Sequence, residues 1–121
     1  MRIGINCGHT VSGEVGCGAV GYIDESVEAR NVGYALEDLL KKAGHTVYDC
    51  TNDYAPTVSS NLRQIVDKAN SQPLDLFVSI HFNSGGGQGT EVWTYGGKKF
   101  GEATNTCKAI SELGLKNRGI K

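Results

Sequence analysis

The sequence predicts an α/β fold, in which a mainly parallel, twisted sheet carries helices on both of its faces. Two observations lead to this prediction. Short apolar runs alternate along the chain with segments in which apolar residues recur every three or four positions, as on one face of a helix. The length of 121 residues suits one compact domain over residues 1–121, because a core this small forms only if nearly all of the chain packs.

Four short runs are predicted to be strands. Residues 2–7 form an apolar run that Gly8 stops, and residues 46–50 and 74–80 have the same character, which is typical of strands buried in a sheet. Residues 91–95 follow a turn that contains three consecutive glycines, and we expect a fourth strand there.

Three further segments have helical periodicity, and each is predicted to present one apolar face. The faces are Val32, Leu36, Leu39, Leu40 and Ala43 in the first helix, Leu62, Ile65, Val66 and Ala69 in the second, and Phe100, Ala103, Cys107 and Ile110 in the third. Gly44 would end the first helix, and Pro56 with Thr57 would start the second. The predicted order is strand, loop, helix, strand, helix, strand, strand, helix.

Composition and charge limit the classes of function. With 39% hydrophobic and 21% charged residues the chain is typical of a globular domain. Its net charge is −1 and its basic residues are scattered, so we expect no nucleic acid as a partner. No apolar stretch is long enough for a membrane span or a signal peptide, so we expect no membrane insertion.

The four cysteines, Cys7, Cys17, Cys50 and Cys107, are far apart in the sequence and form no C-x-x-C pair. This spacing argues against a cysteine zinc site and against a redox pair. Reduced thiols that are buried or partly buried are the simplest interpretation, and the even count leaves a disulfide open.

Two of the three histidines follow predicted strands. His9 comes just after the first strand, and His81 comes just after the apolar run 76–80. Because a parallel sheet binds its ligands beyond the carboxyl ends of its strands, we expect both imidazoles at the same edge. Glu25 stands at the start of the first helix and can turn toward that edge. Two histidines and a glutamate are a known catalytic zinc set for hydrolysing amides or esters, with a fourth position left open for water.

The spacing leaves other interpretations open. Positions 9, 25 and 81 match no compact motif such as H-E-x-x-H, and two histidines at strand ends can simply be hydrogen-bonded loop residues. Glu28, one helical turn after Glu25, competes with it as the third ligand, or is a solvated acid in the first turn of a helix. His45 follows Gly44 at the carboxyl end of a helix, where an imidazole needs no other role.

Two rival functions arise from other residues. Residues 16–21 spell G-x-G-x-x-G and Asp49 ends the second strand, as in a dinucleotide-binding module, but that fingerprint has its glycines directly after the first strand, where His9 stands. Cys7 would be the nucleophile of a thiol hydrolase with a histidine as base. We expect Cys7 instead to be the last inward-facing residue of a buried strand.

Several segments together resemble a known family. They are Gly8-His9 after the first strand, an acid before the first helix, L-F-V-S-I-H-F-N at residues 76–83, G-T-E-V-W-T-Y at residues 89–95 and N-R-G-I-K at residues 117–121. In this order they resemble the zinc-dependent N-acetylmuramoyl-L-alanine amidases of the third type, which occur in bacterial autolysins and phage endolysins. The resemblance spans the whole chain.

The resemblance implies that Zn²⁺ is the cofactor, with His9, Glu25 and His81 as its ligands. Glu28 lies three residues too late for that register, and Ala29 stands where an asparagine often follows the ligand acid. The implied substrate is peptidoglycan, cut between the lactyl group of N-acetylmuramic acid and the L-alanine of the stem peptide. Asn83 and the turn at residues 85–89 would line the cleft, although a tight turn alone explains the glycines equally well.

The family's fold continues past the R-G-x-K segment into a strand that carries a catalytic glutamate. We therefore expect this general base to lie beyond Lys121, and the amidase-like domain to be incomplete at its carboxyl end. Loss of such a base lowers a rate by about 100- to 10,000-fold, so the alternative is a non-catalytic zinc- or cell-wall-binding fragment. Glu91 is expected to form a surface pair across strands instead of replacing the base.

The resemblance also carries expectations about location and assembly. Without a signal peptide, the protein would stay in the cytoplasm until release and then act at the bacterial cell wall, as a phage-type lysin does, or it would be a trimmed secreted protein. An incomplete sheet would expose an unpaired strand edge, so we expect self-association through that edge.

Overall fold

The computed structural model describes residues 1–121, and the chain divides into two compact units, Met1–Phe82 and Asn83–Lys121. The first unit contains a three-stranded sheet and the second a two-stranded sheet. All strands that pair within these sheets are parallel. The fold is therefore α/β with parallel sheets, as predicted. The assignment of residues 1–121 to one amidase-like domain stays a prediction.

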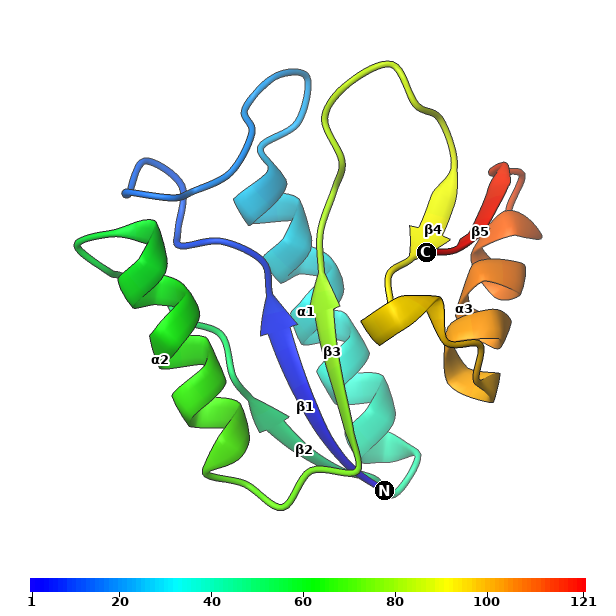
Figure 1. Cartoon of the computed structure of the whole chain (residues 1–121), viewed down its shortest axis with the longest axis horizontal. Coiled ribbons are helices and arrows are strands. Elements are labelled where there is room, and N and C mark those ends of the chain that lie inside the picture. Colours follow the sequence, from blue (N-terminus) through cyan, green and yellow to red (C-terminus); the bar gives the residue numbers. More distant parts are fainter. The chain divides into compact units, whose positions relative to one another are not determined.

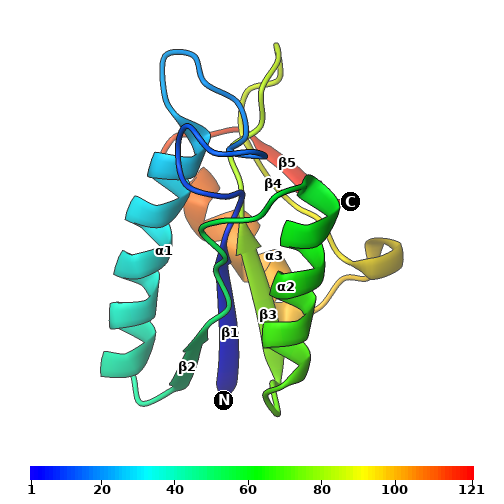
Figure 2. The same cartoon turned by 90° about the vertical axis from the view of Figure 1, so that its left-hand side faces the viewer.

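The first unit is built from alternating strands and helices. Its elements are β1 (Arg2–Cys7), α1 (Glu25–Lys42), β2 (Thr46–Asp49), α2 (Val58–Asn70) and β3 (Leu76–Ile80). The strand order is β2-β1-β3, so β1 lies in the middle of the sheet (Figure 1). Helices α1 and α2 cover opposite faces of this sheet, as predicted (Figure 2).

The central strand β1 supplies most of the core of the first unit. Ile3, Ile5 and Cys7 are buried, with Ile5 and Cys7 fully inaccessible to solvent. The strand has a partner on each side, which satisfies its backbone groups along both edges. Strand β1 begins and ends at the predicted residues. The prediction succeeds because a strand buried on both faces is a continuous apolar run, and the bounds of such a run can be read from the sequence.

The apolar face predicted for α1 is mostly wrong: Leu36 and Leu40 are half-buried, but the other three residues of that face are exposed. The buried residues of this helix include Ala29, Gly33 and Glu37, which are spaced four apart, whereas Val32 and Leu39 are exposed. The reason is a close approach of helix and sheet: a Cβ atom added at Gly33 would collide with Sγ of Cys7. Only small residues fit this contact, so the larger apolar side chains lie beside it or in solvent.

Gly44 and Thr57 mark helix ends as predicted, whereas the cap of α1 at Asp24 was not predicted. Asp24 caps α1 by accepting a hydrogen bond from the amide of Val27 at 3.2 Å, and Thr57 caps α2 by accepting one from the amide of Ser60 at 3.1 Å. Gly44 follows α1 with a φ of 86°, a conformation that favours glycine.

Helix α2 buries only part of its predicted apolar face. Ile65 is buried, but Leu62 and Val66 are exposed. The neighbouring buried position is the polar Asn61, whose Oδ1 accepts a hydrogen bond from Nδ2 of Asn52 at 2.9 Å. This hydrogen bond attaches the start of α2 to the loop after β2.

The second unit contains the elements β4 (Thr90–Val92), the 3₁₀ turn η1 (Tyr95–Gly97), α3 (Gly101–Ser111) and β5 (Asn117–Ile120). Strand β4 is shorter than the predicted run 91–95, and Tyr95 belongs instead to η1, in which Gly96 and Gly97 have positive φ. Strand β5, which pairs with β4, was not predicted. Ala103 and Cys107 of α3 are buried, as its periodicity predicted.

All four cysteines are free thiols, and Cys7, Cys50 and Cys107 are buried. None of the helices is both long and apolar enough to cross a lipid bilayer.

Candidate metal centre

His9, Glu25 and His81 come together in the first unit at the carboxyl ends of β1 and β3. Oε1 of Glu25 lies 3.0 Å from Nε2 of His9 and 3.2 Å from Nδ1 of His81. The two imidazole nitrogens are 3.2 Å apart, and the rings meet edge to face at 80°. Each residue offers one ligand atom, and these atoms all lie within 4.8 Å of one another. The parallel sheet thus brings together residues that are far apart in the sequence.

Glu25 is held in place by the backbone. It is the first residue of α1 and is buried, and its Oε2 and Oε1 accept hydrogen bonds from the amides of Ala19 at 3.2 Å and Phe82 at 3.1 Å. Burial raises the pKa of this carboxyl, but the amides of Ala19 and Phe82, together with His9, outweigh burial and place the pKa below its ordinary value. Glu25 is therefore an anchored carboxylate.

The tautomer of His9 follows from its other nitrogen. Nδ1 of His9 lies 3.1 Å from the carbonyl oxygen of Gly16. A carbonyl only accepts hydrogen bonds, so Nδ1 must carry the proton, and the lone pair of a neutral imidazole then lies on Nε2, the atom that faces Glu25. This arrangement is the one that metal-binding histidines usually have.

The donor set fits a divalent transition metal. A lone pair on Nε2 of His9 and a carboxylate oxygen 3.0 Å away repel each other unless a positive charge lies between them, supplied by a metal ion or by protons on the imidazoles. Two imidazoles and one carboxylate suit zinc, whereas Ca²⁺ and Mg²⁺ prefer oxygen ligands alone. Three protein ligands leave a fourth position for water or substrate.

The glycine-rich loop before α1 forms part of this site. A Cβ atom at Gly18 would lie 2.7 Å from Cδ2 of His9 and 2.9 Å from Oε2 of Glu25, so only glycine fits there. Together with the carbonyl of Gly16, this close contact explains the G-x-G spacing of the loop. The rival dinucleotide motif loses its support, because two carboxylates, of Asp24 and Glu25, stand at the start of α1 where a phosphate would bind.

The other candidate residues lie outside the group. Glu28 has only Asn31 as a polar contact, at 3.4 Å, and is not one of the converging residues. His45 lies 3.2 Å from the amino group of Met1. Cys7 is fully buried, and burial raises the pKa of its thiol, which argues against a nucleophilic thiolate.

Asn83 and Glu91 interact with each other inside the second unit. Nδ2 of Asn83 donates to Oε1 of Glu91 at 2.9 Å, and Nε1 of Trp93 donates to the same oxygen at 3.1 Å. Arg118 forms an ion pair with the other carboxylate oxygen at 3.2 Å. Glu91 is therefore paired across strands, as expected, but its side chain is only 7% exposed, so the pair does not lie on the surface as expected. The role of Asn83 toward a substrate stays a prediction.

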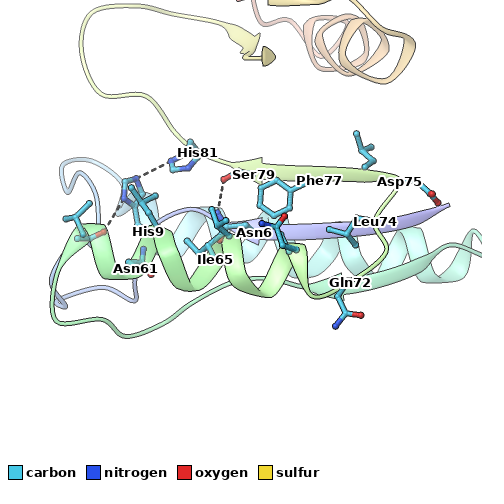
Figure 3. A pocket seen from close by; sticks show the side chains of 17 residues that line it. Asn6, His9, Asn61, Ile65, Gln72, Leu74, Asp75, Phe77, Ser79 and His81 are labelled. Atoms are coloured by element: carbon cyan, nitrogen blue, oxygen red, sulfur yellow. Dashed lines mark hydrogen bonds between the residues drawn. The ribbon is translucent and has the colours of Figure 1, made fainter. Parts of the chain in front are cut away.

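A groove of about 690 Å³ opens between α2 and the sheet, with the two histidines at one end (Figure 3). Its lining is mostly apolar and includes Leu62, Val66 and Phe77. Asn6 is a polar exception: its Nδ2 donates to Oγ of Ser79 at 2.8 Å, while its buried Oδ1 has no hydrogen-bond partner. The sequence periodicity indicated the apolar residues of α2 but not their exposure.

The chain is similar to known proteins in both sequence and fold. The family model described as N-acetylmuramoyl-L-alanine amidase matches residues 3–121. An uncharacterized protein of Clostridium perfringens is 38% identical over 131 residues, which cover 100% of this chain and 37% of the relative. The chain thus spans little more than a third of the length of that relative.

Two solved structures are similar to the chain as a whole. The catalytic domain of an endolysin that targets Clostridium difficile superposes with a TM-score of 0.82 at 28% identity, covering 100% of this chain and 69% of the other. The catalytic domain of an N-acetylmuramoyl-L-alanine amidase from Bacillus (Paenibacillus) polymyxa gives a TM-score of 0.72 at 26% identity, covering 98% and 68%.

Proposed function

Because the chain belongs to the N-acetylmuramoyl-L-alanine amidase family, we propose that its protein hydrolyses the amide bond between N-acetylmuramic acid and L-alanine in peptidoglycan, with zinc as cofactor. The observation that carries the zinc part of this proposal is the convergence of Nε2 of His9, Nδ1 of His81 and Oε1 of Glu25. The family and the amidase structures support the reaction, and the donor set supports the metal.

Each of the three residues has a definite task in this proposal. His9 and His81 offer neutral nitrogen ligands, and Glu25 offers one negative charge, so a bound divalent ion keeps a net positive charge. When bound, zinc supplies the Lewis acidity that polarises an amide carbonyl and acidifies water. The amides of Ala19 and Phe82 hold the Glu25 carboxylate in its ligand position. Gly16 holds the required tautomer of His9.

General acid and base catalysis needs a further group. Glu25 is the only carboxylate in the converging group, and it serves there as a ligand. Glu91 is already paired with Arg118 and Asn83 in the second unit, so it is a poor base. The family resemblance predicts the base beyond Lys121, and we propose the same for this protein.

The test is an assay for new L-alanine amino groups when the chain is incubated with purified peptidoglycan. We expect zinc-dependent release that a chelator abolishes, at a rate about 100- to 10,000-fold below that of a domain with its general base. His81→Ala removes a proposed ligand and should abolish the release. His45→Ala removes the third histidine, which lies outside the site, and should leave the rate unchanged. New reducing sugar ends instead of amino groups would contradict the proposal.

The second candidate is a non-catalytic fragment that binds zinc and the cell wall. It is favoured because the group contains no carboxylate besides the proposed ligand Glu25 that could act as a general base. Binding of zinc and of insoluble peptidoglycan without any new amino groups would support this candidate. Under either candidate we propose that the protein acts at the bacterial cell wall after release from the cytoplasm. The similarity to an endolysin catalytic domain supports this location.

A further inference from the structure

His9 has an unusual backbone conformation. Its φ is 69°, and it is the only residue other than glycine with a positive φ. A side chain in this left-handed region is strained, and such a conformation persists only where surrounding contacts hold it. The contacts that hold His9 therefore matter for the direction of its imidazole.

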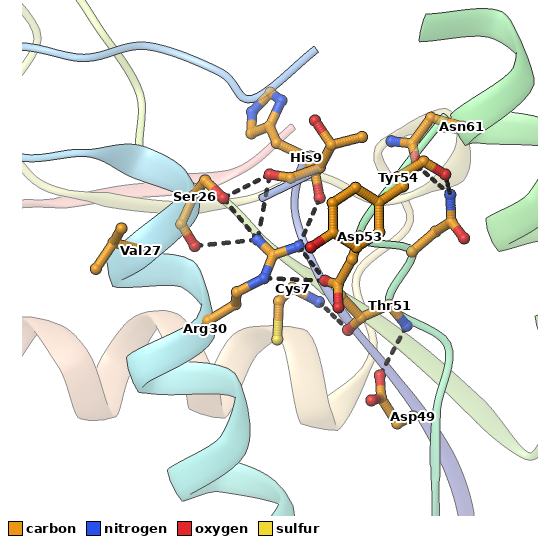
Figure 4. A network of polar contacts seen from close by, with 12 residues as sticks. Cys7, His9, Ser26, Val27, Arg30, Asp49, Thr51, Asp53, Tyr54 and Asn61 are labelled. Carbon is orange, nitrogen blue, oxygen red and sulfur yellow. Dashed lines mark hydrogen bonds and ion pairs between the residues drawn. The ribbon is translucent and has the colours of Figure 1, made fainter. Parts of the chain in front are cut away.

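One guanidinium group supplies several of these contacts. Nη2 of Arg30 donates to the carbonyl oxygen of His9 at 3.2 Å, and Nη1 donates to that of Thr10 at 3.4 Å (Figure 4). Nη1 also donates to Oγ of Ser26 at 2.7 Å. The hydroxyl of Ser26 in turn donates to the carbonyl oxygen of Thr10, so two residues of α1 hold the same loop carbonyl.

Asp53, in the loop after β2, fixes the other side of the guanidinium. Its Oδ1 accepts from Nη2 of Arg30 at 2.7 Å and from Nε at 3.2 Å. The backbone carbonyl of Asp53 also accepts a hydrogen bond from the amide of Val11 at 3.0 Å. The side chain of Arg30 is only 12% exposed, whereas that of Asp53 is 44% exposed, so the guanidinium is shielded from water and its carboxylate partner is partly solvated.

Arg30 thus connects the loop that carries His9 with the helix that carries Glu25. Both Glu25 and Arg30 belong to α1, so a guanidinium that holds the carbonyl of His9 also fixes the distance between the two ligands. We infer that Arg30, oriented by Asp53, is a positioning residue that holds His9 in its metal-binding conformation. This inference rests on the proposed metal centre.

Arginine is specifically suited to this position. Its planar group offers five N–H donors, which here reach four loop or helix oxygens and one carboxylate at the same time. Lysine has the charge but a single nitrogen, so it could keep the contact with Asp53 and not the whole set. A lysine variant therefore separates the charge of Arg30 from its geometry.

The experiment compares zinc affinity, by competition with a chromogenic chelator, in wild type, Arg30→Gln and Arg30→Lys. Arg2→Gln is the matched control, because it removes another arginine–aspartate pair, with Asp75, that lies at the opposite end of β1. Loss of an outer partner of a metal ligand typically weakens binding by about 10- to 100-fold. We expect that loss for Arg30→Gln, a smaller one for Arg30→Lys and less than about twofold for Arg2→Gln.

Hydrogen exchange of the Val11 amide in metal-free protein supplies a second readout. If Arg30 holds the loop, exchange is faster in Arg30→Gln and unchanged in Arg2→Gln. If Arg30→Gln does not fold, Asp53→Asn tests the inference in its place, because it removes only the charge that orients Arg30. This variant should weaken zinc binding several-fold. Wild-type zinc affinity in these variants would overturn the inference. Normal protection of Val11 but no zinc binding in the wild type would instead overturn the metal centre itself.

Discussion

Nε2 of His9 lies 3.0 Å from Oε1 of Glu25, although a whole glycine-rich loop separates the two residues in the sequence. This short distance joins the end of β1 to the start of α1. It favours Glu25 over Glu28 as the proposed third ligand, since Glu28 lies outside the converging group.

Glu25→Gln should weaken zinc binding by more than about a hundredfold, because it removes the only negatively charged ligand. Loss of a residue that merely hydrogen-bonds a ligand already weakens metal binding by up to about a hundredfold. Glu28→Gln is the matched control on the same helical turn and should change the affinity less than about threefold. Chelator competition measures both affinities. Equal losses in the two variants would show that net charge, and not ligation by Glu25, determines binding.

Gly18→Ala should abolish zinc binding, because the new Cβ would lie 2.7 Å from Cδ2 of His9 and 2.9 Å from Oε2 of Glu25. Gly13→Ala is its control. Both glycines have a φ near 85°, so both variants bear the backbone penalty of about 1 kcal/mol, but a Cβ at Gly13 has nothing within 4 Å. Zinc content and the melting temperature are measured for both. A Gly18→Ala protein that binds zinc normally would contradict this geometry.

Gly33→Ala should destabilise the protein by about 1–3 kcal/mol, the usual effect of overpacking, because its Cβ would collide with Sγ of Cys7. Helix propensity alone predicts the opposite sign, since alanine is favoured over glycine by about 1 kcal/mol. The double variant with Cys7→Ala removes the colliding sulfur and should recover part of the loss. Urea unfolding of the four proteins in this cycle measures the coupling, and strict additivity would argue against the contact.

The Arg2–Asp75 pair predicts a defined dependence of stability on pH. Hydrogen bonds from the side chain and backbone of Arg2 lower the pKa of Asp75 from 3.8 to about 2. A carboxyl with a lower pKa in the folded state stabilises the fold above its unfolded pKa and loses that effect as the pH falls through its folded pKa. The difference in urea midpoint between wild type and Asp75→Asn should therefore be full at pH 6, shrink below pH 4 and vanish only below pH 2. A constant difference would contradict the assignment.

The sequence predicted those parts of the fold and site that depend on local pattern. The apolar run of β1 sets its bounds, and the rule that ligands lie at the carboxyl ends of parallel strands placed His9 and His81 at one edge. Strand β5 could not be predicted, because N-R-G-I has no alternation of apolar and polar residues. Its Gly119 also has a φ of 81°, which is outside the usual range for a strand.

Other features depend on tertiary contacts that no local pattern contains. The face of α1 was mispredicted because its contact with β1 is so close that Gly33 and Ala29 replace larger residues. Arg30 was not singled out, because its role depends on Asp53 in a loop that is distant in the sequence. The glycine spacing at residues 16–18 was visible in the sequence, but only the fold shows that it accommodates His9 and Glu25.

The metal content of the purified protein shows whether His9, Glu25 and His81 bind zinc. Elemental analysis after dialysis would compare wild type with His81→Ala and with His45→Ala, whose histidine lies outside the site. We expect about one zinc per chain in wild type and in His45→Ala, and none in His81→Ala. The absence of zinc from folded wild type, or zinc retained in His81→Ala, would contradict a metal centre formed by His9, Glu25 and His81.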